Sequence, residues 1–106
     1  MPQFSVTVPH QTSQQEATER VRSLVDRIAQ SQAGQVEVLE QTWADNVLNF
    51  GFKSFGMKIT GSMTVGPNDV RVVGDIPFAA MLFKGKIESG IQEQLTRMLG
   101  GPKSGG

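Results

Sequence analysis

The fold of this chain is constrained most by three consecutive stretches in which apolar and polar residues alternate. They cover residues 47–54, 57–65 and 70–76, with only a few residues between them. A period of two is typical of a strand that buries one face. The intervening "GPND" at 66–69 is a tight-turn signal. Because short turns join strands into antiparallel hairpins, these stretches predict one continuous antiparallel sheet.

Two further strands and two helices complete the predicted elements. Residues 4–8 alternate before Pro9, and residues 36–43 form another extended segment. Ser13 stands three residues before Glu16, the spacing of a capping box, so a helix should begin there. Its apolar stripe consists of Ala17, Val21, Leu24, Val25 and Ile28. A second stripe after Pro77 consists of Ile87, Ile91, Leu95 and Met98.

The element order is therefore β-α-β-β-β-β-α. Two amphipathic helices require one apolar sheet face to cover. The expected fold is an α+β two-layer sandwich, in which an antiparallel sheet of about five strands carries two helices on one face. A chain of 106 residues fits a single domain, here residues 1–99. Residues 100–106, "GPKSGG" with the glycine before it, are expected to be a flexible tail.

Composition excludes several classes of function. Ten basic residues balance ten acidic ones, so there is no electrostatic signature of nucleic-acid binding. The chain has no cysteine, one histidine (His10) and no nucleophile or phosphate-loop motif. We therefore expect no enzyme, catalytic residue, metal or cofactor. No apolar run reaches about 18 residues and no signal peptide is seen, so we expect a cytoplasmic protein without a membrane span.

A surplus of large apolar residues follows Pro77. Phe78, Met81, Leu82 and Phe83 precede a helix whose stripe begins only at Ile87. Whether residues 78–85 form a helix or an extended linker, no single face can bury all four, so at least one of Leu82 and Phe83 should be exposed. Exposed apolar clusters usually mark an interface. The alternatives are self-association, contact with an apolar ligand or surface, and burial in the core.

Two other groups are candidate site residues. Trp43 should share a strand face with Leu39, opposite Val36 and Val38, which suggests a central or interface strand rather than a free edge. A pocket between the sheet and the second helix would be lined by Phe50, Met57, Met63 and Ile91.

With these residues laid out, the chain resembles the bacterial polyhydroxyalkanoic acid system protein family, also called the granule-region family. The resemblance covers about residues 2–99. It rests on "FSVTVPH" before a long helix, on "NVLNFGFKSFGMKITGSMTVGPNDVRV", on "DIPFAAMLFKGKIESGI", and on a helix ending at "LTRML". A weaker resemblance is to the C-terminal part of helix-grip (START-like) proteins, which hold apolar ligands between sheet and helix.

The family resemblance implies an association with bacterial storage polyester and transfers no catalytic residue. The first hypothesis is a non-enzymatic accessory or structural protein that docks through Phe78–Phe83, with Trp43 as a further contact. Its partner would be the polyester granule surface, a granule protein or a second copy of the chain. The alternatives are a small apolar-ligand carrier of helix-grip type and a homodimeric interaction module unrelated to polyester.

Overall fold

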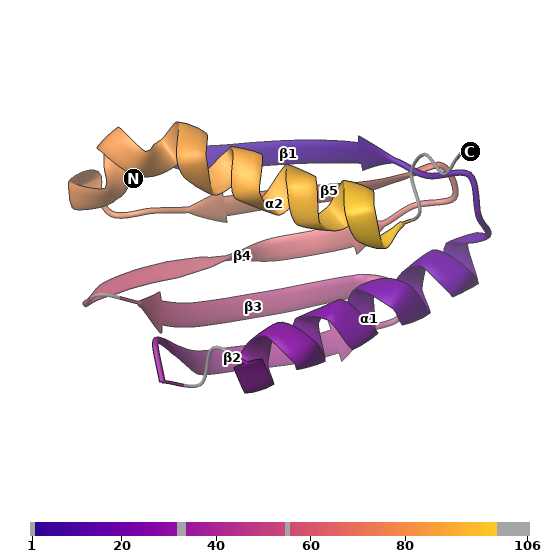
Figure 1. Cartoon of the computed structure of the whole chain (residues 1–106), viewed down its shortest axis with the longest axis horizontal. Coiled ribbons are helices and arrows are strands. Elements are labelled where there is room, and N and C mark those ends of the chain that lie inside the picture. The colour runs from indigo at the N-terminus through magenta and orange to yellow at the C-terminus, as the bar shows by residue number, and fades with distance from the viewer. Residues whose placement is uncertain (1, 32–33, 55, 100–106) are drawn as a thin grey trace.

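The computed structural model describes residues 2–31, 34–54 and 56–99, and these form one antiparallel sheet with two helices on the same face (Figure 1). The strands are β1 (Gln3–Pro9), β2 (Val36–Ala44), β3 (Val47–Ser54), β4 (Met57–Val65) and β5 (Asp69–Asp75). Their spatial order is β1-β5-β4-β3-β2, so β1 and β2 are the two edge strands. The predicted α+β fold with the order β-α-β-β-β-β-α is confirmed. The predicted tail, residues 100–106, lies outside the described residues.

Helix α1 (Gln14–Ser31) begins where the capping signal placed it. The Ser13 hydroxyl oxygen accepts a hydrogen bond from the Glu16 backbone N–H at 3.0 Å, which satisfies one of the free donors of the first turn. One turn later Arg20 forms an ion pair with Glu16 at 2.7 Å on the solvent side. The opposite side buries Ala17, Val21 and Leu24 against the sheet.

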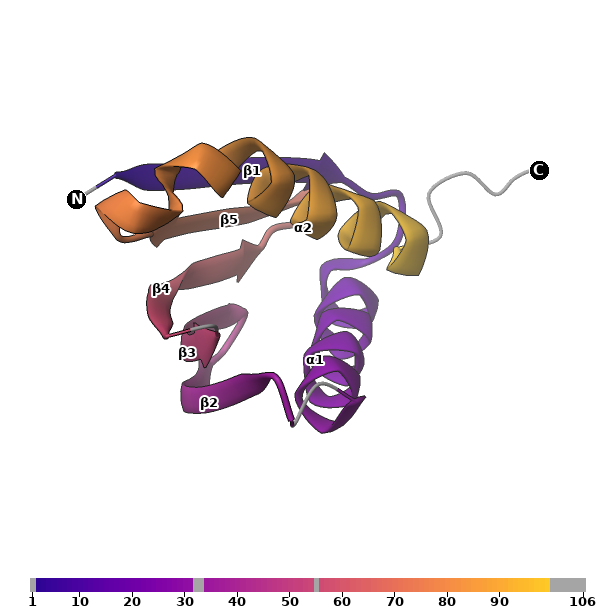
Figure 2. The same cartoon turned by 60° about the vertical axis from the view of Figure 1, so that its left-hand side comes forward.

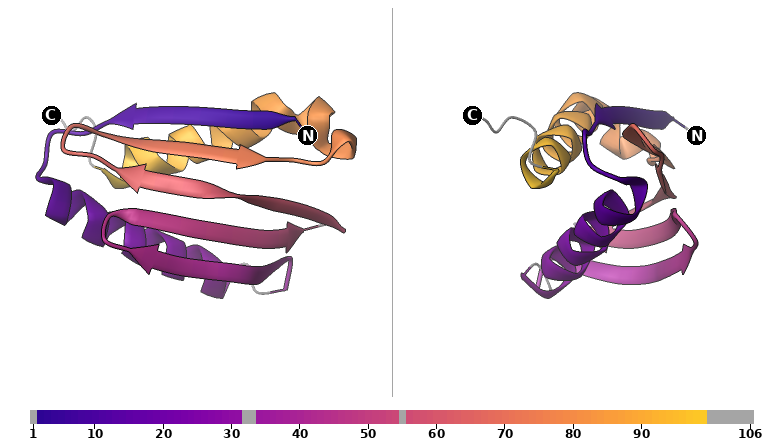
Figure 3. Two further views of the ribbon diagram at one scale, coloured as in Figure 1. Left: turned by 180° about the vertical axis from the view of Figure 1, so that it is seen from behind. Right: turned by 90° about the vertical axis from the view of Figure 1, so that its right-hand side faces the viewer.

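The sheet bends sharply, and both helices lie on its concave side (Figure 2; Figure 3, right). Two glycines face each other across the β4–β5 ladder, Gly61 and Gly74, and their neighbours in the ladders to either side are Phe50 and Phe4. A Cβ atom on Gly74 would lie 2.6 Å from the Phe4 ring, and one on Gly61 would lie 3.0 Å from the Phe50 ring. Both aromatic rings therefore pack over glycine backbone, in space that a Cβ atom at either glycine would take.

The junction at residues 78–85 is helical throughout, which settles the alternative that the sequence left open. A 3-10 helix, η1 (Phe78–Phe83), runs directly into helix α2 (Lys84–Met98). The Ala80 backbone N–H donates to the Pro77 carbonyl at 2.9 Å and fixes the first turn. Ala80 is the buried residue of η1, whose remaining side chains are exposed.

The predicted arrangement of β2 is wrong in two respects. The register with β3 shifts between Val38 and Glu40, because Leu39 is an extra residue that forms a β-bulge. Val38 is paired with Phe52 and Trp43 with Leu48, so Val38 and Trp43 share the helix-facing side and Leu39 does not. Among the described residues the strand is also an edge of the sheet, paired with β3 alone, so the predicted central position is wrong while the interface alternative stays a prediction. A bulge moves the alternation by one residue, which a strict period of two does not anticipate.

Candidate functional site

The first candidate site is a cluster of exposed apolar side chains on η1, which we call the η1 patch. It consists of Phe78, Met81, Leu82 and Phe83, exposed by 73%, 51%, 91% and 50%. In a 3-10 helix residues three apart lie on one side, so Phe78 and Met81 stand together, as Ala80 and Phe83 do. The expectation that at least one of Leu82 and Phe83 is exposed is confirmed for both.

The position of the patch is set by the backbone around it. Pro77 ends the extended segment after β5, and the Lys84 N–H donates to the Met81 carbonyl, so η1 continues into α2 without a loop. In Figure 1 the turn stands out beyond the end of the sheet, at the start of α2. The patch is therefore a convex protrusion held by local hydrogen bonds, with Ala80 as its anchor in the core.

The second candidate site is an apolar cavity of about 460 Å³ between the helices and the sheet, which we call the helix cleft. Its walls come from the second half of α1, from residues 86–95 of α2, and from the sheet, mainly β2, β3 and β4 with Phe4 of β1 and Val72 of β5. In Figure 1 the two helices lie closest near the start of α1 and diverge away from it. The principal apolar residues are Leu24, Val25, Ile28, Leu48, Phe50, Phe52, Ile59, Met63, Ile87 and Ile91.

Three of the four predicted pocket residues line the helix cleft: Phe50, Met63 and Ile91. Met57 does not. It is paired with Ser54 at the turn end of the β3–β4 hairpin and packs against the core from there. Sequence reasoning missed the α1 side of the cleft. The available signal was the length of the α1 stripe, which reaches Ile28, a residue that is 38% exposed at the rim.

Trp43 is not part of the η1 patch. It lies on β2, at the opposite edge of the sheet from β1 and β5, which adjoin η1. It is half-buried, and the guanidinium carbon of Arg22 lies 4.8 Å from the centroid of its ring, a cation–π contact between α1 and β2. Within the described residues its buried indole N–H has no hydrogen-bond partner. The structure therefore separates Trp43 from the four residues with which the sequence hypothesis grouped it.

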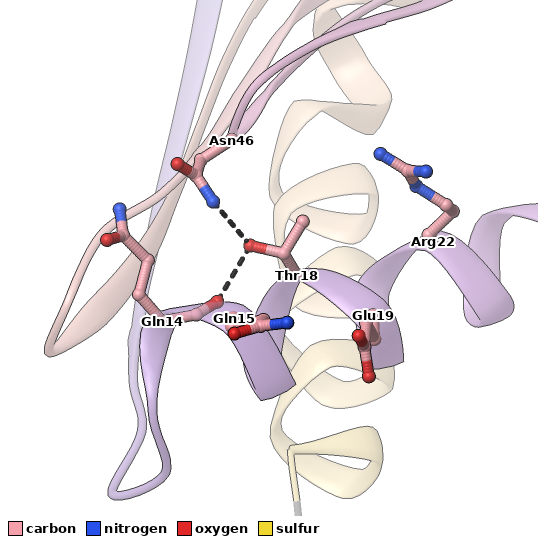
Figure 4. Close-up of a pocket in the computed structure, with 6 residues that line it drawn as sticks. All are labelled: Gln14, Gln15, Thr18, Glu19, Arg22 and Asn46. Carbon is pink, nitrogen blue, oxygen red and sulfur yellow. Dashed lines mark hydrogen bonds between the residues drawn. The ribbon is translucent and has the colours of Figure 1, made fainter.

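A polar hollow beside the start of α1 is held together by its own hydrogen bonds (Figure 4). The Asn46 amide donates to the Thr18 hydroxyl oxygen at 2.9 Å, and that hydroxyl donates to the Gln14 carbonyl at 2.7 Å. Gln15, Glu19 and Arg22 complete the rim. These hydrogen bonds join α1 to the β2–β3 turn. Because the inner polar atoms are paired with one another, they are not available as hydrogen-bonding groups for a ligand.

The hydrogen bonds of His10 give it a structural role. His10 is buried, its Nδ1 accepts the Thr12 N–H at 3.3 Å, and its Nε2 therefore donates to the Gly66 carbonyl at 2.9 Å. This neutral tautomer ties the β1–α1 connection to the β4–β5 turn. Across residues 2–31, 34–54 and 56–99, no three His, Cys, Asp or Glu residues are grouped as metal ligands. None of the described helices combines the length and apolarity needed to cross a membrane.

Comparison with known proteins identifies the family. No curated protein sequence matches the chain. A family model matches residues 4–99, and its description is "Putative polyhydroxyalkanoic acid system protein". The match includes all five strands except the first residue of β1, both helices, the η1 patch and the helix cleft. This chain therefore belongs to the polyhydroxyalkanoic acid system protein family.

Proposed function

We propose that this protein is a non-enzymatic accessory protein of the polyhydroxyalkanoate system that attaches to storage polyester through the η1 patch. One observation carries the proposal: four large apolar side chains close together in the sequence are half to almost fully exposed on one short 3-10 helix. Membership of the polyhydroxyalkanoic acid system family supports the polymer as the partner. The proposed location is the surface of polyester granules in the cytoplasm.

The energetics fit weak and reversible attachment. Exposed apolar patches of a few hundred Å² commonly mark interaction sites. If about 300 Å² enters an apolar phase at about 25 cal/mol per Å², the gross gain is roughly 7 kcal/mol. Lost translational and rotational freedom offsets a large part of that gain. Such a protein would exchange between the polymer surface and solution.

The shape of the patch favours a soft polymer over a second copy of the chain. A stable protein–protein interface buries about 800 Å² on each partner and needs complementary surfaces. The η1 patch is convex and smaller than that. An amorphous polymer can deform around a protruding turn, so every exposed side chain can be covered without a matching concave partner.

Co-sedimentation with amorphous polyester particles tests the proposal, with phosphatidylcholine vesicles of equal surface area in parallel. The test variant is Leu82→Asp, because Leu82 is 91% exposed and its replacement leaves the core intact. The matched control is Leu39→Asp, which adds the same charge at another exposed leucine, on the β2 bulge. Circular dichroism establishes that both variants are folded.

We expect the parent and Leu39→Asp to sediment with polyester and Leu82→Asp to lose about ten-fold or more in affinity. Equal binding of Leu82→Asp and the parent would contradict the proposal. Equal binding to vesicles and polyester would replace the polymer with lipid as the partner. If the parent does not bind polyester, direct attachment is wrong, and measurement of molecular mass then shows whether the patch joins two copies.

A further inference from the structure

The interior of the helix cleft is apolar on every wall. Ile28, Phe50, Met63 and Ile91 come from four of the elements around it, and none of the lining residues that are buried or half-buried has a charged or hydrogen-bonding side chain. A ligand with polar groups along its length would lose their hydrogen bonds to water without replacement. An occupant should therefore be apolar along its length and polar only at the end that remains at the mouth.

The mouth carries five polar residues, and contacts of the described residues account for three of them. Glu93 is paired with Arg97 at 3.0 Å, and the Gln41 amide donates to Asp26 at 2.9 Å. Glu40 is the cross-strand partner of Gly51, which is paired with Thr60. Its Cβ atom lies 3.7 Å from the position that a Gly51 Cβ would take, so its side chain starts on the outer face of the sheet.

Lys86 is the charged residue at the mouth of the cleft that these contacts do not account for. It lines the cleft one turn before Gly90, and within the described residues it forms no hydrogen bond or ion pair. Glu93, the other charged lining residue that is not on the outer face, is already paired with the Arg97 cation. The charge left available at the mouth is therefore positive, which complements an anionic end group.

Space for a ligand is present beside α2. Gly90 lines the cleft, yet a Cβ atom built on it would meet no atom within 4 Å. The cavity volume of about 460 Å³ lies within the range of roughly 300–1,000 Å³ that is usual for small-molecule sites. Figure 2 shows the two helices on the concave side of the sheet.

We propose that the helix cleft binds an unbranched aliphatic carboxylate, with its chain between the helices and the sheet and its carboxylate beside Lys86. This site is distinct from the η1 patch and does not depend on attachment to polyester. Binding in solution, without polymer present, therefore tests it separately from the proposed function.

The experiment is a calorimetric titration with decanoate, and with decanol as the uncharged analogue, below the micelle concentration. Gly90→Leu adds a side chain to a residue that lines the cleft, at a position where a Cβ atom would meet no atom within 4 Å. Gly85→Leu is the matched control, since it lies on the same helix, is equally open and does not line the cleft. Lys86→Met removes the cation and keeps the aliphatic stem.

We expect the parent to bind one decanoate per chain, and Gly90→Leu to weaken binding about ten-fold or more while Gly85→Leu has no effect. Lys86→Met should weaken decanoate about two- to five-fold and leave decanol unchanged, as befits an exposed ion pair. Leu82→Asp should bind decanoate as the parent does.

Equal affinity of Gly90→Leu and Gly85→Leu for decanoate would overturn the assignment of the cleft. Equal weakening of decanoate and decanol by Lys86→Met would overturn the assignment of the carboxylate to Lys86. Absence of decanoate binding by a parent protein that sediments as a dimer would mean that a second copy covers the cleft, and the proposal would then be wrong.

Discussion

The η1 patch and the helix cleft are both apolar, but the chain builds them in opposite ways. The patch lies within a single run of six residues, and its four side chains are exposed on one short helix. The cleft needs α1, α2 and all five strands, and its lining residues extend from Phe4 to Leu95. One is convex and local, and the other is concave and assembled by the whole fold. Destabilising the fold should therefore affect the cleft first, and local substitutions should separate the two.

The largest effect is expected where the fold supports the cleft. Gly74→Ala would place a Cβ atom 2.6 Å from both the Phe4 ring and the Thr60 carbonyl oxygen. We expect the free energy of unfolding to fall by about 1–3 kcal/mol, because the Thr60 oxygen is backbone and cannot move aside freely. Urea denaturation measures it. Gly34→Ala, where the Cβ would meet nothing within 4 Å, is the control and should change little.

The same substitution in each region sharpens the comparison. Leu24→Ala removes a buried wall of the cleft and should cost about 2 kcal/mol or more. Leu82→Ala removes an exposed side chain of the patch and should change stability by less than about 0.5 kcal/mol. Thermal unfolding of both variants checks this. A loss of stability at Leu82 equal to that at Leu24 would show that the patch is buried in solution.

Helix α2 joins the two regions, and substitutions at its two glycines, Gly85 and Gly90, should have a smaller effect on the free energy of unfolding. Gly85→Ala and Gly90→Ala should each raise the free energy of unfolding by about 0.5–1 kcal/mol, because alanine favours the helix and neither Cβ meets a neighbour. Chemical denaturation of the single and double variants should give additive gains. Stabilisation at Gly85 with destabilisation at Gly90 would mean that the cleft is narrower than described.

The smallest effect concerns pH at the start of α1, remote from both regions. The hydrogen bond from the Thr12 hydroxyl, followed by that from Arg20 and its charge, lowers the pKa of Glu16. Because the pKa is lower in the folded state, this contact stabilises the protein above the unfolded-state pKa, and the gain is lost as pH falls through the folded-state value. Thr12→Val should raise the pKa of Glu16 in an NMR titration. An unchanged pKa would contradict the role of Thr12.

Much of the fold could be predicted from local patterns, and the patch with it. Alternation at residues 57–65 and the Ser13 cap each depend on neighbours close in sequence, and so does the apolar surplus at 78–83. The Leu39 bulge could not be predicted, since one extra residue between Val38 and Glu40 leaves no local mark. The cleft depends on the divergence of two helices that are distant in sequence. Local patterns could predict the lining residues Phe50, Met63 and Ile91. They could not predict Leu24, Lys86 and Gly90, because these line the cleft only through the relative placement of the two helices.

The start of the described chain lies beside the η1 patch. The Pro2 carbonyl accepts the Ile76 N–H at 2.9 Å, two residues before Phe78. Leu99 lies beyond the far end of α2, whose 15 residues span about 22 Å. A fluorescent protein fused ahead of Pro2 would therefore stand against the surface that is proposed to touch polyester, whereas one fused directly after Leu99 would begin at the other end of α2. Failure of an N-terminal fusion to label granules in cells would say nothing about the native protein, and only the C-terminal fusion gives an informative image.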